Sequence, residues 1–219
     1  MEFADVVRRR RMVRRYDPDR PVPAEVVQRL LSHATRAPSA GFAQGWAFLV
    51  LEAADDRERF WTAASPPAGA RTRWLDGMRT APLIIVPLSD KSAYLDRYAE
   101  PDKGWTDRDE ARWAVPYWHV DTGMAALLML LTAVDEGLGA CFFGIPPQRL
   151  DAFRAAFGVP AGHTPVGAVS LGYRAADHRS ASLARGRRSL DEVVHRGTWG
   201  ATVEAAQASA GARNVADGG

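Results

Sequence analysis

The spacing of apolar residues along the chain predicts an alternation of helices and strands. Apolar residues recur every three or four positions in the helical segments and form short continuous runs in the strands. The predicted helices span residues 2–12, 24–37, 54–64, 68–80, 117–136 and 146–158. The predicted strands span residues 46–52, 81–89, 139–145 and 163–173. This order predicts an α+β fold in which helices cover a central mixed sheet of four or five strands.

Three further segments depart from this alternation. The helix at 117–136 is apolar on nearly every face, which predicts a place in the core or at a subunit interface. Its apolar run, 123–134, is too short to span a bilayer, so no membrane partner is expected. Residues 90–116 show little periodicity and predict a long loop that is functional or acts as a lid. Residues 174–200 form a basic tail with a turn near 189–194.

Length and composition predict one globular domain over residues 1–200. The 219-residue chain is 47% hydrophobic and carries a formal charge of +2, which gives no general attraction to nucleic acid. The Ala- and Gly-rich residues 201–219 are expected to be disordered. A single cysteine rules out an intrachain disulfide and suits a reducing, cytoplasmic location. The sequence has no zinc spacing, no Rossmann glycine motif and no P-loop.

Arginines near the N-terminus are the first candidate for chemistry. Arg10, Arg11, Arg14 and Arg15 lie close together, and Arg10 and Arg14 would share a face if the first helix continued through them. Two guanidinium groups on one face can clamp a phosphate, because each donates to two oxygens. A solvated basic patch would have the same sequence.

Two small-residue segments and the tail are further candidates. The segment PSAGFAQGW, 38–46, links a helix to a strand and could bring backbone close to a flat ligand, or could be a plain connection. The segment GLGACFFGIP, 137–146, ends a predicted core strand at Gly144, where backbone N–H groups could face a ligand. Arginines of the tail segment 184–194 could complete a phosphate site or belong to an unstructured end.

Taken in order, these segments resemble the nitroreductase family. The family's opening Arg-Arg-Ser-x-Arg-x-aromatic element corresponds to RRMVRRY at 10–16, and its Ala-Pro-Ser-x-x-Asn-x-Gln-Pro-Trp element to APSAGFAQGW at 37–46. An Ala-Pro strand corresponds to APLIIV at 81–86. The Asp-x-x-x-Ala helix and following Gly-Leu-Gly strand correspond to DTGMA at 121–125 and GLGACFFG at 137–144. LGYR at 171–174 and the later arginines complete the match.

The resemblance implies an intertwined homodimer that binds FMN at the subunit interface. Arg10 and Arg14, with Arg11 in the same cluster, correspond to contacts with the FMN phosphate and ribityl chain. Pro38, Ser39 and Gln44 correspond to a loop that the partner subunit places at the edge of the flavin. Phe143 and Gly144 correspond to a backbone segment near flavin N5. Arg185 and Arg187 correspond to tail cations on the phosphate.

Departures from the family pattern concern the substrate side of the site. Met12 replaces a common Ser, Phe42 a common Asn and Gly45 a common Pro. Residues expected to meet the substrate are Phe42, Trp105, Trp113 and Tyr117. His119 and Cys141 are expected to be structural rather than catalytic.

The predicted function is hydride transfer from NADH or NADPH through FMN, by a ping-pong reaction, to a small electron-poor acceptor. No catalytic side chain and no metal are expected. One alternative is a specialised relative, such as a reductive dehalogenase, a flavin-fragmenting enzyme or a biosynthetic oxidase. An alternative of another class is a basic nucleic-acid-binding protein, which the near-neutral charge argues against.

Overall fold

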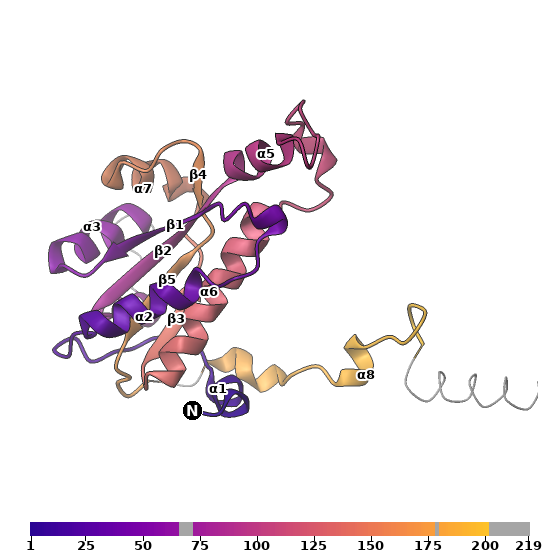
Figure 1. Cartoon of the computed structure of the whole chain (residues 1–219). Helices are drawn as coiled ribbons and strands as arrows, with labels where there is room; N and C mark the ends of the chain where they lie inside the picture. The colour runs from indigo at the N-terminus through magenta and orange to yellow at the C-terminus, as the bar shows by residue number, and fades with distance from the viewer. Residues whose placement is uncertain (66–71, 178–179, 202–219) are drawn as a thin grey trace, which may run out of the picture. The chain divides into compact units, whose positions relative to one another are not determined.

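The computed structural model describes residues 1–65, 72–177 and 180–201, which fall into two units. The first unit comprises Met1–Asp177 and the second His178–Gly219. The first unit contains a five-stranded sheet with helices on both faces, as Figure 1 shows. The predicted α+β class is therefore confirmed, while the single domain over residues 1–200 stays a prediction.

The sheet is built around its second strand. Its strands are β1 (Trp46–Leu51), β2 (Leu83–Asp90), β3 (Gly139–Phe143), β4 (His163–Pro165) and β5 (Ala168–Gly172). The order is β1-β2-β5-β3, with β4 also paired to β2. Every ladder between these strands is antiparallel. The sequence predicts a mixed sheet, and the described residues contain one parallel pairing, the isolated bridge between Met12 and Ala140.

The helices of the first unit come from both halves of the chain. They are α1 (Phe3–Arg9), α2 (Ala24–Ala34), α3 (Ala54–Ala64), α4 (Arg73–Met78), α5 (Lys91–Ala99), α6 (Tyr117–Asp135) and α7 (Leu150–Phe157). Short 3-10 turns lie at Ala40–Phe42, Glu110–Arg112 and Pro147–Arg149.

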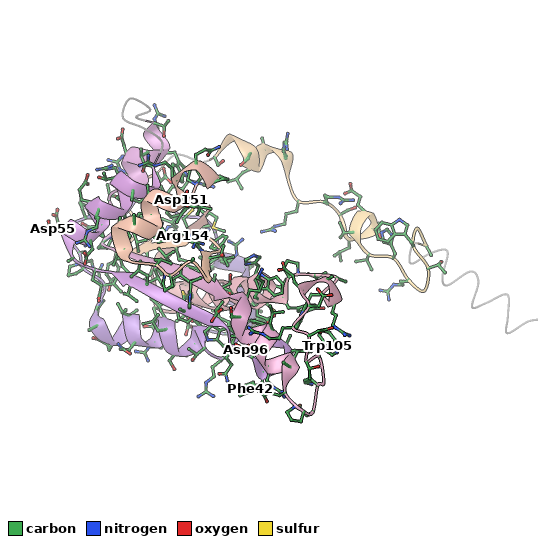
Figure 2. All side chains as sticks on the ribbon, turned by 90° about the horizontal axis from the view of Figure 1, so that it is seen from above. Phe42, Asp55, Asp96, Trp105, Asp151 and Arg154 are labelled. Carbon is green, nitrogen blue, oxygen red and sulfur yellow. The ribbon has the colours of Figure 1, made fainter. Side chains whose placement is uncertain are left out.

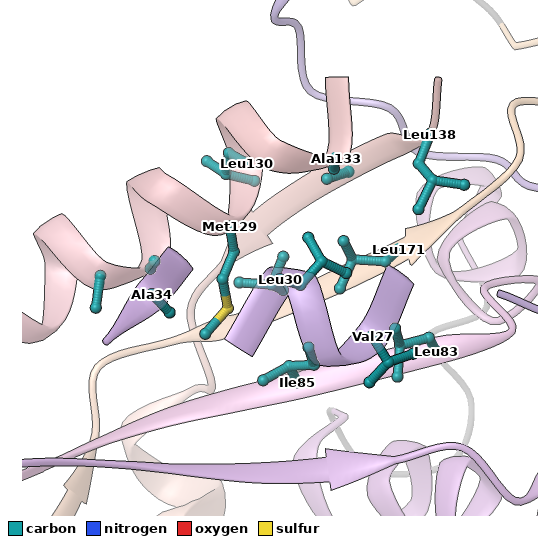
Figure 3. Packing of buried hydrophobic residues seen from close by; sticks show 14 of the residues in the cluster. Val27, Leu30, Ala34, Leu83, Ile85, Met129, Leu130, Ala133, Leu138 and Leu171 are labelled. Atoms are coloured by element: carbon teal, nitrogen blue, oxygen red, sulfur yellow. The ribbon is translucent and has the colours of Figure 1, made fainter. Parts of the chain in front are cut away.

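Two apolar cores form because side chains alternate along β2. Leu83 and Ile85 belong to the core that α2 and α6 cover, which Figure 3 shows at close range. Ile84 and Val86 belong to the opposite core, with Phe60 of α3 and other residues of α4 and α7. Full burial of one such side chain is worth about 1.5–3 kcal/mol, so both faces of the sheet contribute to stability.

Helix α6 is the central helix that the sequence predicts. By length and composition alone it could cross a membrane, but half of its apolar window is buried inside the fold. Its buried face packs on α2 and the sheet, with Met129 and Ala133 fully covered. Tyr117, Val120 and Leu127 remain exposed along the same helix. The helix therefore serves the core and still presents apolar side chains at the surface of the protomer.

Helix α1 ends earlier than predicted, at Arg9 instead of residue 12. Arg10 has extended dihedral angles, with φ −58° and ψ 123°. The following chain bonds to the sheet, since the Val13 N–H donates to the Ala140 carbonyl at 2.9 Å. The buried Tyr16 hydroxyl donates to the Val13 carbonyl at 2.6 Å and lies 2.8 Å from Ser170 Oγ. The Arg10 N–H still donates to the Val6 carbonyl at 3.0 Å, and after it these sheet contacts take the place of further helical bonds.

Two other predicted elements need correction. A helix, α5, occupies the start of the predicted loop 90–116; Asp90 caps it by accepting the Ser92 N–H at 2.8 Å. The predicted strand 163–173 is split into β4 and β5 around Gly167. A Cβ atom at Gly167 would lie 2.5 Å from the Phe142 ring, so the chain can pass there only as glycine.

The second unit is described over residues 180–201. It contains a 3-10 turn, Ala181–Arg185, and the single-turn helix α8, Leu190–Val193. Ser189 and Glu192 form a capping box at α8, so the predicted turn near 189–194 is confirmed. The expected disorder of residues 201–219 falls, except for Ala201, outside the described residues.

Candidate active site

The arginine segment, residues 10–14, runs extended beside β3. The helical face predicted for Arg10 and Arg14 is wrong, because α1 ends before them. Alternate side chains of an extended chain nevertheless point the same way, so Arg10, Met12 and Arg14 share one side. Arg10 and Arg14 are half-buried, and neither forms an ion pair with any residue that the structure describes. Their guanidinium groups are therefore available to an anion.

Arg11 belongs to a different surface. It lines a small cavity of about 190 Å³ together with Arg9, Val13, Gly139 and Arg174. This is the side of the extended segment opposite to Arg10 and Arg14. The structure thus separates Arg11 from the other two arginines, and its expected contact with FMN stays a prediction.

The end of β3 exposes backbone but not side chains. The Phe143 ring stacks on Trp61 with ring centres 5.6 Å apart and planes at 10°. Gly144 is exposed, and a Cβ atom placed on it would meet no atom within 4 Å. Ligands can reach the backbone here without displacing a side chain. At about 3.3 Å per residue, Gly144 lies about 13 Å along the chain from Ala140, which pairs with Met12.

The small-residue loop, residues 38–45, has an unusual backbone. Gly41, Phe42 and Gln44 all have positive φ, at 61°, 57° and 52°. This left-handed region is sterically unfavourable for Phe42 and Gln44, because they carry a Cβ atom and glycine does not. The Ser39 hydroxyl accepts the Gln44 N–H at 2.8 Å and so supports the bend. Pro38, Phe42 and Gln44 are exposed, which leaves this loop accessible from outside the protomer.

Helix α5 explains both glycines of this loop. A Cβ at Gly41 would lie 2.6 Å from the Tyr98 ring. At Gly45 a Cβ would lie 2.6 Å from the Tyr94 ring and 2.7 Å from the Asp90 carbonyl oxygen. The replacement of the family's proline by Gly45 therefore has a local reason, because α5 packs too closely for a larger residue.

Asp121 and Tyr94 connect the loop to the protein interior. Asp121 is 1% exposed, and its Oδ2 accepts the Ala40 N–H at 2.8 Å and the Tyr94 hydroxyl at 2.7 Å. The Tyr94 hydroxyl also lies 3.3 Å from Ser39 Oγ. Burial is the main reason that the pKa of Tyr94 is raised above its usual range, so the phenol stays a donor.

The segment 91–116, called the aromatic cap below, gathers the expected substrate residues. Trp113 lies at its centre, with ring centres 4.5 Å from Tyr98, 5.5 Å from Trp105 and 5.9 Å from Tyr117. Figure 2 shows Phe42 and Trp105 on the same side of the first unit as α5. Phe42 is 75% exposed and does not join the ring cluster. The structure therefore brings three of the four expected residues together and leaves Phe42 at the loop surface.

The charges of the aromatic cap are paired with one another. Arg97 binds Asp102 through two hydrogen bonds of 2.7 and 2.8 Å, which lowers the pKa of that carboxyl group. The other pairs are Lys91–Glu110, Arg108–Asp96 and Arg112–Asp107. These ion pairs connect residues within the aromatic cap, so few cationic side chains on its surface lack a carboxylate partner among the described residues.

The two titratable candidates for chemistry have structural surroundings. His119 Nδ1 lies 2.8 Å from Ser89 Oγ on β2, and burial together with nearby Lys91 lowers the pKa of the ring. Cys141 is 3% exposed, and burial raises the pKa of its thiol to about 11. A thiol with that pKa is almost entirely protonated at neutral pH and is a poor nucleophile.

The two halves of the expected site lie at opposite ends of α6. Asp121, near the start of α6, holds the small-residue loop, whereas Met1 binds Asp135 near its end, where α1 leads into the arginine segment. At 1.5 Å per residue, Asp121 and Asp135 are separated by about 21 Å along the helix. Within the chain, the loop and the start of the arginine segment are therefore held at opposite ends of α6.

Sequence analysis missed three residues that shape this region. Asp121 appears there only as part of a matched motif, while Tyr94 and Arg97 lie in a segment taken for a loop. The four-residue spacing of Tyr94 and Tyr98 is the signal that could have indicated α5. Arg185 and Arg187 are exposed in the second unit, and their predicted contact with the phosphate stays a prediction.

The chain is similar to known proteins over most of its length. The chain is 30% identical over 186 residues to an NADH dehydrogenase of Thermus thermophilus, covering 76% of this chain and 84% of that protein. Among solved structures, a Desulfovibrio desulfuricans protein assigned as a nitroreductase and crystallised with FMN is 27% identical. Its TM-score is 0.66, and the match covers 91% of this chain and 98% of that one.

A second solved structure agrees in fold. It is a nitroreductase family protein of Clostridium difficile, 22% identical with a TM-score of 0.66, and the match covers 90% of this chain and 99% of that one. The nitroreductase family model itself matches residues 7–173, which include the arginine segment, the small-residue loop, α6 and β3. The chain therefore belongs to the nitroreductase family.

Proposed function

We propose that this protein is an FMN-dependent oxidoreductase that takes hydride from NADH or NADPH and passes it to a small electron-poor acceptor. The observation that carries the proposal is the half-buried pair Arg10 and Arg14 beside β3, neither of which forms an ion pair with a described residue, together with the exposed backbone of Gly144 after β3. The names of the relatives support the donor and the cofactor: one is an NADH dehydrogenase, and another was crystallised with FMN.

The described residues fit the shape and charge of FMN. Arg10 and Arg14 would hold the phosphate and ribityl chain, since guanidinium groups bind phosphate oxygens in pairs. The backbone at Phe143 and Gly144, at the end of β3, would donate to the isoalloxazine ring; Gly144 lies about 13 Å along the chain from Ala140, the residue that pairs with Met12. Arg185 and Arg187 of the second unit are proposed to add positive charge at the phosphate.

A homodimer would complete this site. The small-residue loop lies at the end of α6 away from the arginine segment, so Pro38, Ser39 and Gln44 would edge the flavin bound by the partner subunit. The exposed apolar residues Tyr117, Val120 and Leu127 of α6 supply a surface that a second copy can bury. The electron donor, NADH or NADPH, and then the small-molecule acceptor would enter between the two protomers.

When bound, FMN would supply the two-electron redox chemistry that a ping-pong reaction between NADH or NADPH and the acceptor requires. The protein's part is to bind, orient and polarise. The Gly144 backbone N–H would hydrogen-bond the ring, and no side chain would need to exchange a proton during flavin reduction. His119 and Cys141 keep structural roles, so neither is proposed as a catalytic residue.

The acceptor is proposed to be planar. Phe42 is an exposed aromatic ring where the family often has a polar residue, and Trp105 and Tyr117 border the same end of α6. Aromatic side chains favour flat, electron-poor partners such as nitroaromatics, quinones or oxidised flavins through offset stacking.

The proposal is tested by denaturing the purified protein and identifying the flavin that is released. Release of FMN is the expected result. In the native protein, NADH or NADPH should reduce the bound flavin in the absence of oxygen. The protein should also sediment as a dimer at low micromolar concentration. Release of FAD, or no flavin even after incubation with FMN, would contradict the proposal, and a flavin-loaded active monomer would contradict the shared site.

A further inference from the structure

The buried carboxylate of Asp121 has no cationic partner among the described residues. It is 1% exposed, and its two hydrogen-bond donors are neutral: the Ala40 N–H at 2.8 Å and the Tyr94 hydroxyl at 2.7 Å. A buried charge without a counter-ion is costly, so hydrogen bonds must offset the loss of water. Both donors belong to the small-residue loop or to the helix that packs against it.

The loop needs contacts with other elements to keep its conformation, because its own backbone dihedral angles are unfavourable. Phe42 and Gln44 have positive φ and carry side chains, so an isolated loop would relax to other conformations. Within the loop, the bond from the Gln44 N–H to Ser39 Oγ closes the bend. The bond from Ala40 to Asp121 is the described link between this bend and the interior of α6.

A second hydrogen bond from another element fixes the loop at Gly41. The Arg97 Nε–H donates to the Gly41 carbonyl at 2.8 Å, while the two terminal nitrogens of the same guanidinium bind Asp102. Asp121 of α6 thus binds the loop at Ala40, and Arg97 of α5 binds it at Gly41. The loop, the aromatic cap and the start of α6 are joined in one hydrogen-bonded unit.

We propose that Asp121 is a positioning residue, which fixes the left-handed loop and thereby the exposed Phe42 and Gln44. Its carboxylate would not touch flavin or substrate. The consequence for the flavin site rests on the proposed function, whereas the consequence for the loop does not. In the partner's site, a loosened loop would present Gln44 less often in the binding geometry and so weaken FMN binding.

Hydrogen exchange of the loop amides tests the positioning role without any cofactor. Peptides covering residues 38–45 would be followed by mass spectrometry in the flavin-free protein. Asp121→Ala should speed exchange of these amides about tenfold or more, because Ala40 and Tyr94 lose their acceptor. Asp121→Asn should stay close to the parent, since both bonds end on one oxygen that an amide oxygen can replace.

Thr122→Ala is the matched control. Thr122 is the next residue of α6, is fully buried and donates only to the Trp118 carbonyl of its own helix. The Thr122→Ala substitution should speed amide exchange in the loop no more than it speeds exchange in the rest of α6. If Asp121→Ala does not fold, Tyr94→Phe removes one donor and should raise loop exchange by a smaller factor.

The inference is overturned if loop exchange in Asp121→Ala matches that in Thr122→Ala, or if Asp121→Asn is as damaged as Asp121→Ala. FMN affinity provides a second readout, expected to fall about tenfold in Asp121→Ala and little in Asp121→Asn. A loosened loop with unchanged FMN affinity would support the positioning role and contradict the proposed placement of the loop at the flavin.

Discussion

The arginine segment and the aromatic cap use positive charge in opposite ways. In the cap, Lys91, Arg97, Arg108 and Arg112 each have a carboxylate partner on the same segment. In the arginine segment, the half-buried Arg10 and Arg14 have none among the described residues. Paired cations shape the protein itself, whereas half-buried cations left unpaired indicate a ligand that brings the negative charge.

The two regions also differ in what holds them to the fold. Backbone bonds to β3 and the buried Val13 and Tyr16 fix the arginine segment, so the fold depends little on the side chains of Arg10 and Arg14. The aromatic cap has no strand pairing and depends on ring contacts around Trp113 and on its ion pairs. Substitutions should therefore affect stability in the cap and ligand binding in the arginine segment.

The largest expected effect is on stability, from Trp113→Ala. Removing the central ring of the cap should lower the free energy of unfolding by about 3 kcal/mol, at the low end for a buried aromatic residue. The denaturant midpoint measures the loss. Trp199→Ala is the control, because Trp199 is 89% exposed in the second unit. Equal and small losses in the two variants would mean that the ring cluster does not hold the cap.

Arg14→Ala should affect the ligand and leave the fold intact. The loss of charged hydrogen bonds should weaken FMN binding by about 1.5–3 kcal/mol. Titration of the flavin-free protein, followed by flavin fluorescence, gives the affinity. Riboflavin, which lacks the phosphate, should bind the variant nearly as well as the parent. Equal losses for FMN and riboflavin would show that Arg14 acts through the fold.

A paired arginine of the cap should matter much less. Arg108→Ala removes the exposed pair with Asp96 and should cost about 0.2–1 kcal/mol of stability, less in high salt. FMN affinity should not change. Unfolding curves at low and high salt measure the effect, and a loss of FMN affinity comparable to that of Arg14→Ala would erase the contrast between the two regions.

His119 should give the smallest effect, visible only as pH dependence. Its pKa in the folded protein lies below the usual 6.5, because of burial and the nearby charge of Lys91. The unfolded chain therefore binds a proton more readily, and stability should fall as pH drops below about 6.5. His119→Gln should flatten this fall between about pH 7 and 5. A steeper fall in the variant would reverse the assigned direction of the pKa shift.

His119→Gln also tests the absence of an essential acid or base. If the variant keeps FMN, its flavin should be reduced within about tenfold of the parent rate, below the loss typical of a general acid or base. Stopped-flow bleaching by excess NADH or NADPH without oxygen isolates this step. A thousandfold slowing would identify His119 as a catalytic residue.

The sequence by itself determined the fold class, the strands, the central helix and the family. Continuous apolar runs such as 81–89 and the period of α2 are local patterns, and burial follows from them directly. The motifs at 10–16, 37–46 and 137–144 were equally readable, since each depends on residue identity and order. The structural roles expected for His119 and Cys141 stay predictions, which the His119→Gln variant tests for the histidine.

Only the tertiary structure decided what the local signals left open. The end of α1 at Arg9 depends on bonds to Ala140, more than 120 residues away in the chain. Helix α5 buries one fully covered residue, Tyr94, so the spacing of Tyr94 and Tyr98 is a weak amphipathic signal, and only the structure showed the helix. The role of Asp121 requires Ala40 and Tyr94 to meet on one oxygen, and no spacing in the sequence encodes a contact among three separate elements.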